Sequence, residues 1–335
     1  MNRRHEAGRS IGPAFRRQKR LAQLQARAVS TARCQEGEDP PDYASELLAT
    51  ARAVTDEIGD PPAGPVLRAR TLARMATLRI DKRIVLRFPR ITVASFRVDI
   101  PADPPLAVPE VAPADVAECL TREGVEVALI ADAPPIRTWR EVFSVAGLKP
   151  STYKSSPEAL ARRFLKGGAI PTPLPLVNLY CAVSAKHLAP LGGYDLERLD
   201  AVAASRDVVL RFAKPGDRFA PLGGRPDDFA LRSDIPVYAC GSEVVCWAFN
   251  VRDSAATSLV EATRHALFVG EALNEDQSDR LISAITELRD TLQSAGFACG
   301  TVTSADATQP TSSAREPSEP GRSPLSGSPL SRYRD

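Results

Sequence analysis

Residues 139–199 read WREVFSVAGLKPSTYKSSPEALARRFLKGGAIPTPLPLVNLYCAVSAKHLAPLGGYDLERL, and this stretch decides the fold of the chain. It runs from one helical segment through a Lys-Pro turn into a helix with a well-marked start. Ser156 occupies the expected N-cap position, Pro157 the first helical position, and Glu158 the positive end of the helix dipole. Two glycines then end the helix.

An apolar run follows at 176–183, and it predicts a β-strand. Asn178 and Tyr180 are two residues apart, so in a strand they share one face. The turn Gly192-Gly193 comes next, immediately before Tyr194 and Asp195. Glycine lets a ligand approach the backbone closely, so a glycine turn beside a polar strand face is a candidate binding site.

Helices and strands alternate along the rest of the chain. The spacing of apolar residues predicts further helices at 43–58, 67–79, 114–123, from about 136, 259–267 and 276–294. Strands are expected at 80–88, 91–98, 125–130, 208–213, 235–239 and 244–249. We therefore expect a basic disordered arm at 1–40, a helical extension at 41–79, a main domain at 80–300 and a disordered Ser/Pro-rich tail at 301–335.

The charge distribution limits how the chain could bind nucleic acid. Residues 1–33 carry nine basic side chains against one acidic one, whereas the remainder has a formal balance of −6. The basic arm could hold a polyanion, but a passive leader or a transit peptide fits the same composition. A mildly acidic body needs a local patch for phosphate contacts. Arg162, Arg163 and Lys166 form a candidate RNA-binding patch on one helix, with a solvated helix face as the alternative.

Composition points to a soluble, cytoplasmic protein without metal or cofactor. No apolar run approaches the ~20 residues of a membrane span. The six cysteines lack a C-x-x-C pair and fit reduced thiols. No zinc-ligand spacing, G-x-G-x-x-G motif or P-loop is present.

Catalytic triads are not supported, because only His5, His187 and His265 exist and each lies in a polar or helical context. A set of polar residues beside glycine-rich backbone is the better candidate site. We expect Arg252 and Asp253 to be catalytic. The expected substrate-binding residues are Asn178, Tyr180, Gly192, Gly193, Asp195, Trp247, Asn250 and Thr257. Such a set could hold a zwitterion while backbone N–H groups activate a carbonyl or a water. Alternatively, Asp195 caps a turn, Arg252 pairs with an aspartate, and Trp247 is part of the core.

Several segments together resemble a known family. They are Trp139-Arg140, Gly147-x-x-Pro150, 155–167, 175–184, 192–199, 208–224 and 237–270. In order and spacing they look like the B3/B4 domain of the phenylalanyl-tRNA synthetase β subunit, and still more like its free-standing relatives. The likeness spans roughly residues 80–273. It implies an α+β fold, a mixed β-sandwich with flanking helices, and a site that hydrolyses mischarged aminoacyl-tRNA.

This chain departs from the synthetase domain at two points. Gly192 stands where that domain keeps a pocket histidine, and Asn250-Val251-Arg252-Asp253 replaces its Gly-Gly-Glu loop. The free-standing relatives show an aromatic-Asn-x-Arg-x-Ser/x-x-x-Thr pattern here, which this chain matches from Phe249 to Thr257.

Three functions remain open from the sequence. The first is a deacylase that acts in trans on mischarged aminoacyl-tRNA. The second is a non-catalytic module that binds RNA or a free amino acid. The third is a scaffold that assembles with a synthetase.

Overall fold

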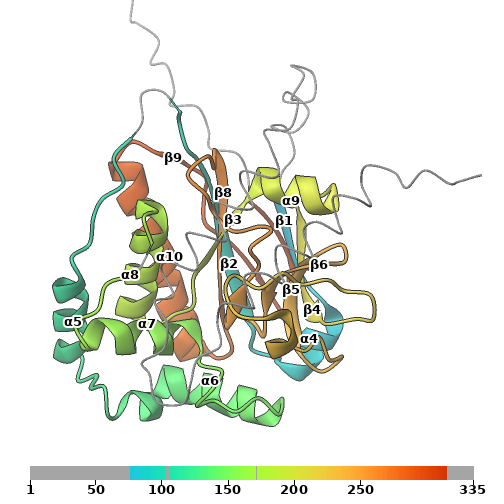
Figure 1. Cartoon of the computed structure of the whole chain (residues 1–335), viewed down its shortest axis with the longest axis horizontal. Coiled ribbons are helices and arrows are strands. Elements are labelled where there is room, and N and C mark those ends of the chain that lie inside the picture. The colour runs from blue at the N-terminus through green and yellow to red at the C-terminus, as the bar shows by residue number, and fades with distance from the viewer. Residues whose placement is uncertain (1–75, 103–105, 171, 315–335) are drawn as a thin grey trace, which may run out of the picture. The chain divides into compact units, whose positions relative to one another are not determined.

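Two sheets, with most of the helices on one side of them, make up the computed structural model (Figure 1). The structure describes residues 76–102, 106–170 and 172–314. The basic arm, the helix at 43–58, residues 67–75 and the tail beyond 314 lie outside the described residues. The predicted α+β class is confirmed.

One sheet has six described strands in the order β11-β1-β4-β5-β6-β7. Only β1 and β4 run parallel; the other neighbours are antiparallel. The bounds are β1 Ala76–Ile80, β4 Asp207–Phe212, β5 Pro236–Cys240, β6 Glu243–Trp247, β7 Arg252–Asp253 and β11 Thr311–Ala314.

The second sheet has the antiparallel order β10-β2-β8-β3, and the short β9 also pairs with β2. Its strands are β2 Thr92–Asp99, β3 Gly192–Asp195, β8 His265–Ala272, β9 Ala298–Cys299 and β10 Thr303–Asp306.

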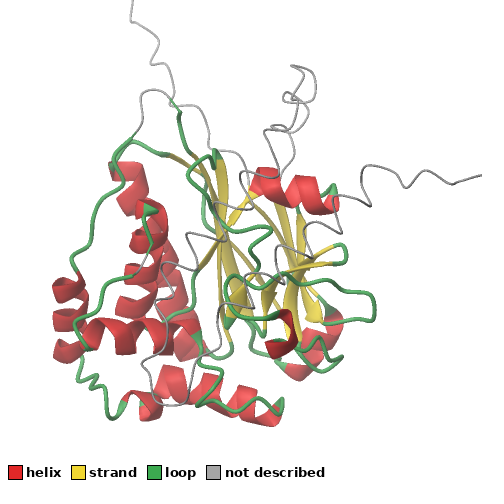
Figure 2. Cartoon of the chain, viewed as in Figure 1, coloured by secondary structure: helices red, strands yellow, loops and turns green. Residues whose placement is uncertain are grey.

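Two hydrophobic layers hold the sheets and helices together. Val93, Leu267 and Val269 of the five-stranded sheet pack with the inner side of the six-stranded sheet. Phe96 and Phe268 point to the other side, stack at 5.3 Å, and meet the helices. Figure 2 shows the resulting order, with helices against one sheet and the second sheet behind it. Residues along one strand alternate between these two hydrophobic layers, because successive side chains of a strand point to opposite faces of the sheet.

The helices take their places through apolar faces. They are α4 Lys82–Arg87, α5 Pro113–Arg122, α6 Pro134–Val145, α7 Ser156–Leu165, α8 Pro175–His187, α9 Leu196–Ala203 and α10 Glu275–Ser294, with 3-10 turns at Ile130–Asp132 and Pro226–Asp228. Buried leucines of α10 pack on the five-stranded sheet. α5, α7 and α8 share a further cluster around Leu120 and Phe164.

Most expected elements are confirmed within a residue or two: β2, β4, β5, β6, α5, α6, α7 and α10. The marked helix start is also correct to one residue. α7 begins at Ser156, its N-cap is Ser155, and that side chain makes no capping hydrogen bond. Instead the Ser156 N–H donates to Asn250 Oδ1 at 3.1 Å.

The predicted strand at 176–183 is wrong, because these residues form α8. Pro175 stands in its first turn, where its fixed φ and missing N–H suit a helix. Leu179 and Val183 face the five-stranded sheet, while Ala182 and Ala185 face α5 and α7. A helix buried on two sides carries no polar stripe, so its apolar run resembles a strand.

Four other segments also differ from the prediction. Residues 80–88 are the end of β1 followed by α4, whose N-cap Asp81 accepts the Arg83 N–H at 2.8 Å. Residues 76–79 belong to β1 and not to a helix. The expected strand at 125–130 is turns and a 3-10 helix, and the expected helix at 259–267 is a loop leading into β8.

Residues 301–314, which were expected to be disordered, contain two strands. β10 pairs with β2, and β11 pairs with β1. Four-residue strands of Thr, Ser and Ala carry little apolar signal, so only backbone pairing to existing edges makes them recognisable.

Candidate functional site

Asp253 lies at the centre of a polar cluster between the sheets. β7 places it opposite Cys246 of β6, and it remains partly exposed. Burial raises the pKa of its carboxyl, while hydrogen bonds from Cys246 and Tyr194 and the charge of Arg252 act in the opposite direction. Asp253 therefore holds a proton more readily than an ordinary aspartate.

Two tyrosines and two cysteines surround this carboxyl. Burial raises the pKa of Tyr180 and Tyr194 well above the usual phenol value, and it raises the pKa of Cys181 to about 12. The pKa of Cys246 shifts in the same direction for the same reason. The negative charge of Asp253 contributes to every one of these four shifts. We call these five residues the Asp253 cluster; at neutral pH its phenols and thiols are proton donors.

Gly192 brings backbone close to the cluster. A Cβ on Gly192 would lie 3.1 Å from the Tyr194 hydroxyl and 3.9 Å from Asp253 Oδ1. A side chain at this position would therefore crowd the Tyr194 hydroxyl. Gly192 and Asp253 are each partly exposed, whereas the two tyrosines and two cysteines of the cluster are buried.

Glu271 extends the cluster inward, and the sequence did not reveal it. Tyr238 donates to its Oε2 at 2.9 Å, and Asn250 Nδ2 donates to its Oε1 at 2.7 Å. Burial raises the pKa of this carboxyl to about 7, with the charge of Asp253 adding to the shift and both hydrogen bonds opposing it. The available signal was a single charged residue inside the apolar run at 266–272.

A strained turn positions Asn250. Ala248 and Phe249, between β6 and β7, have φ values of 51° and 63°. Left-handed backbone at non-glycine residues costs of order 1–3 kcal/mol each. The Phe249 ring packs edge-on against Phe88 and Trp139, both at 5.4 Å, and so holds the turn. Asn250 can then bridge the start of α7 and Glu271.

The remaining predicted site residues have structural contacts. Asp195 accepts the Arg198 N–H at 2.9 Å, as the N-cap of α9, and the Thr263 hydroxyl at 2.6 Å. Trp247 donates to the Ala230 carbonyl at 3.1 Å within an aromatic group. These two side chains serve the fold.

The four other predicted site residues differ in the contacts that they make. They are Gly193, Asn178, Arg252 and Thr257. A Cβ on Gly193 would lie 2.9 Å from Leu259, so a close approach explains this glycine. Asn178 Nδ2 donates to the Thr172 carbonyl, and Arg252 Nη1 donates to the Leu222 carbonyl at 3.1 Å. Thr257 is fully buried beside β3, and its hydroxyl has no partner among the described residues.

The three cations of the predicted RNA-binding patch on α7 have different surroundings. Arg162 binds Glu158 at 3.0 Å and the Val127 carbonyl at 2.8 Å. Glu158 is fully buried and also accepts from Arg140 at 2.8 Å. Arg163 and Lys166 are exposed. Arg162 therefore ties α7 to its neighbours, while the other two cations face solvent.

Both described histidines contact carboxylates apart from the Asp253 cluster. His187 ends α8 and binds Glu287 at 2.7 Å, together with Lys186. His265 belongs to β8, not to a helix, and binds Asp99 at 2.7 Å.

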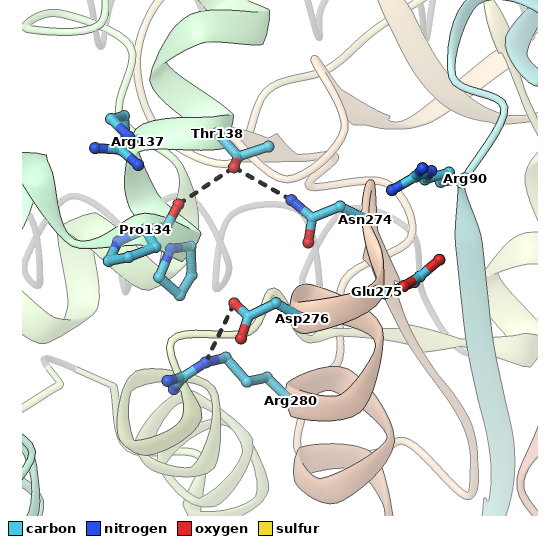
Figure 3. A pocket seen from close by; sticks show the side chains of 9 residues that line it. Arg90, Pro134, Arg137, Thr138, Asn274, Glu275, Asp276 and Arg280 are labelled. Atoms are coloured by element: carbon cyan, nitrogen blue, oxygen red, sulfur yellow. Dashed lines mark hydrogen bonds and ion pairs between the residues drawn. The ribbon is translucent and has the colours of Figure 1, made fainter.

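A cleft of about 420 Å³ opens elsewhere, between the starts of α6 and α10 (Figure 3). Asn274 donates to the Thr138 hydroxyl at 3.3 Å across it, and Arg280 pairs with Asp276 at 3.8 Å. None of the predicted site residues lines this cleft.

Metal-ligand clusters and membrane-spanning helices are both absent from the described part of the chain. No three His, Cys, Asp or Glu side chains there gather as metal ligands. No helix formed by these residues combines the length and apolarity needed to cross a bilayer.

Comparison with known proteins identifies the domain. The model of the B3/4 domain family matches residues 138–291, which run from α6 into α10 and include the whole Asp253 cluster and Glu271. No curated protein matches the chain. The matched segment agrees with the likeness read from the sequence, in which the order and spacing of several motifs carried the resemblance. Residues 138–291 are thus a B3/4 domain, of the type found in the phenylalanyl-tRNA synthetase β subunit.

Proposed function

We propose that this protein binds tRNA and hydrolyses the ester bond of mischarged aminoacyl-tRNA, with the Asp253 cluster as its reactive site. The B3/4 domain supports the assignment to a synthetase-related, nucleic-acid-binding module. The observation that carries the proposal is the carboxyl of Asp253, whose pKa is raised by burial and which lies among four protonated donors. Perturbed carboxyls of this kind are typical of general acids and bases.

The chemistry requires little machinery, because an aminoacyl ester is already activated. Asp253 would accept a proton from the attacking water, and Tyr194 and Tyr180 could donate hydrogen bonds to the developing oxyanion. The buried Thr257 hydroxyl beside β3 would find a partner in a bound substrate. Arg252 would hold a nearby phosphate or carboxyl group. Arg163 and Lys166 remain proposed RNA contacts. Arg162 has fewer N–H groups left to donate to RNA, because it already donates to Glu158 and to the Val127 carbonyl.

A panel of mischarged tRNAs tests the activity. Purified protein is incubated with each, and loss of the ester bond is followed against buffer alone. We expect at least one pair to be deacylated faster than in buffer, and Arg252→Ala to slow it. If no pair is hydrolysed faster than in buffer, the enzyme proposal fails.

A second candidate is a module that binds RNA or an amino acid without catalysis. The observation that favours it is the placement of His187 and His265 against Glu287 and Asp99, apart from Asp253. Binding of tRNA without any acceleration of ester loss would support this candidate over the deacylase. Assembly with a synthetase remains a third possibility, read from the sequence alone.

A further inference from the structure

Helix α4 presents an exposed basic face. At 100° per residue, Lys82, Arg83, Leu86 and Arg87 fall on one arc of the helix, opposite the fully buried Ile84. All four are exposed to solvent. Figure 1 places α4 beside β4, at one end of the six-stranded sheet.

The charge of this segment is concentrated and unbalanced. Residues 79–90 contain one acidic side chain, Asp81, and the five basic side chains Arg79, Lys82, Arg83, Arg87 and Arg90. Asp81 is occupied as the N-cap of α4. None of the five cations forms an ion pair with a carboxylate in the described part of the chain. Several exposed arginines elsewhere are paired with carboxylates, as in Arg122–Glu118 at 2.7 Å.

Two of these cations are held in place by aromatic rings. The Arg83 guanidinium lies 5.2 Å from the Phe212 ring centroid, and that of Arg87 lies 5.4 Å from the Phe88 centroid. Cation–π contacts leave the guanidinium N–H groups free to donate to a phosphate. Because these side chains are already ordered, they give up less conformational entropy when an anion binds.

We propose that the exposed face of α4, with Arg79 and Arg90 beside it, seats the phosphate backbone of an RNA helix. This inference rests on the proposed function and names the surface through which the tRNA binds. An anionic membrane fits less well, because Leu86 is the single large apolar side chain that this face offers.

The α4 surface is connected to the candidate reactive site. Phe88, which follows α4, packs against Phe249 of the strained turn at 5.4 Å. The next residue in that turn, Asn250, binds Glu271 at 2.7 Å. Arg90 also lines the cleft in Figure 3, whose other charged residues are Arg137, Arg280, Glu275 and Asp276. The contact between Phe88 and Phe249 would therefore separate RNA bound to α4 from the hydrogen bond between Asn250 and Glu271.

A charge-matched pair of double variants tests the surface. Lys82→Gln/Arg87→Gln removes two positive charges from α4, and Arg122→Gln/Arg225→Gln removes two from ion-paired surface positions. Affinity of the full chain for tRNA is measured over a series of salt concentrations. We expect the α4 variant to bind more weakly and its log–log salt slope to fall by roughly 1.4–1.8, at about 0.7–0.9 for each phosphate that is no longer neutralised. The control should keep the wild-type affinity and slope.

The outcomes separate the surface from the function. If the wild-type protein binds tRNA and the α4 variant matches it in affinity and slope, the surface proposal is overturned while deacylation can still stand. If Lys82 and Arg87 govern binding to phosphatidylserine vesicles but not to tRNA, a membrane is the partner and the proposal is again overturned. Absence of tRNA binding by the wild type overturns it as well. The proposed function is judged separately, by ester loss with wild-type protein.

Discussion

The ionisation of Glu271 makes the stability of the protein depend on pH. Its pKa is about 7 in the folded protein, against an ordinary value of 4.5, because burial disfavours its charged form. The folded protein keeps this proton over a pH range in which the unfolded chain has released it. The free energy of unfolding therefore falls as pH rises from about 4.5, and levels off above about 7.

Replacement of Glu271 by glutamine should remove this dependence. The amide is permanently neutral and can still accept from Asn250. We expect the stability of Glu271→Gln relative to wild type to rise by about 3 kcal/mol between about pH 4 and about pH 8. Urea unfolding at both pH values measures it. Parallel pH profiles for the two proteins would contradict a raised pKa at this carboxyl.

Arg162 and Arg163 are neighbours with different roles. Arg162→Ala removes bonds to a fully buried carboxylate and to the Val127 carbonyl, so we expect stability to fall by about 1–3 kcal/mol. Arg163 is exposed and donates only to the Ala169 carbonyl, so Arg163→Ala should change stability by about 0.5 kcal/mol or less. Chemical denaturation compares them; equal decreases would refute the structural role of Arg162.

Helix α8 shows at the level of an element what sequence patterns can and cannot reveal. The sequence of α7 contains start and stop signals, with Pro157 and Glu158 at the start and glycines at the end. Its first residue was therefore predicted to within one position. α8 is buried on two sides, so its polar residues follow no stripe and its period is hidden. Local signals therefore suffice where one face is solvated, and fail where neighbours cover both faces.

Two alanine-to-glycine substitutions near the end of α9 should change the stability of the protein in opposite directions. Ala204 follows the helix with φ 49°, a left-handed conformation that glycine adopts without penalty. Ala204→Gly should stabilise the protein by roughly 0.5–1 kcal/mol. Ala201 is exposed in the same helix, and its replacement by glycine should destabilise the protein by about the same amount. Thermal unfolding should therefore move in opposite directions; a shift in the same direction would contradict the assigned backbone.

At the level of the whole molecule, the C-terminal strands complete both sheets. A chain ending at Gly300 lacks β10 and β11, and it exposes the edges of β2 and β1. We expect it to unfold at clearly lower urea concentration than the full chain. A chain ending at Ala314 keeps both strands and should match the full chain. Equal midpoints for all three proteins would contradict a structural role for these strands.

The candidate site was only partly accessible from the sequence. Three residues that the sequence predicted for the site, Tyr180, Gly192 and Asp253, lie near one another, although Tyr180 was assigned to a strand and lies on a helix. Glu271 was missed because its partners Tyr238 and Asn250 are 33 and 21 residues away. Asp195 and Trp247 fitted the motif, but they hold α9 and the aromatic core. Motifs locate such a site, while pairing between strands determines which side chains face it.

The most direct test of the central claim compares two Asp→Asn variants on the tRNA that the wild-type protein deacylates fastest. Asp253→Asn removes the proposed base of the cluster, and Asp234→Asn changes an exposed aspartate paired with Arg232. We expect Asp253→Asn to lower the rate of ester hydrolysis by roughly 100-fold or more while tRNA is still bound, and Asp234→Asn to leave it unchanged. A folded Asp253→Asn variant that hydrolyses the ester at the wild-type rate would contradict the account.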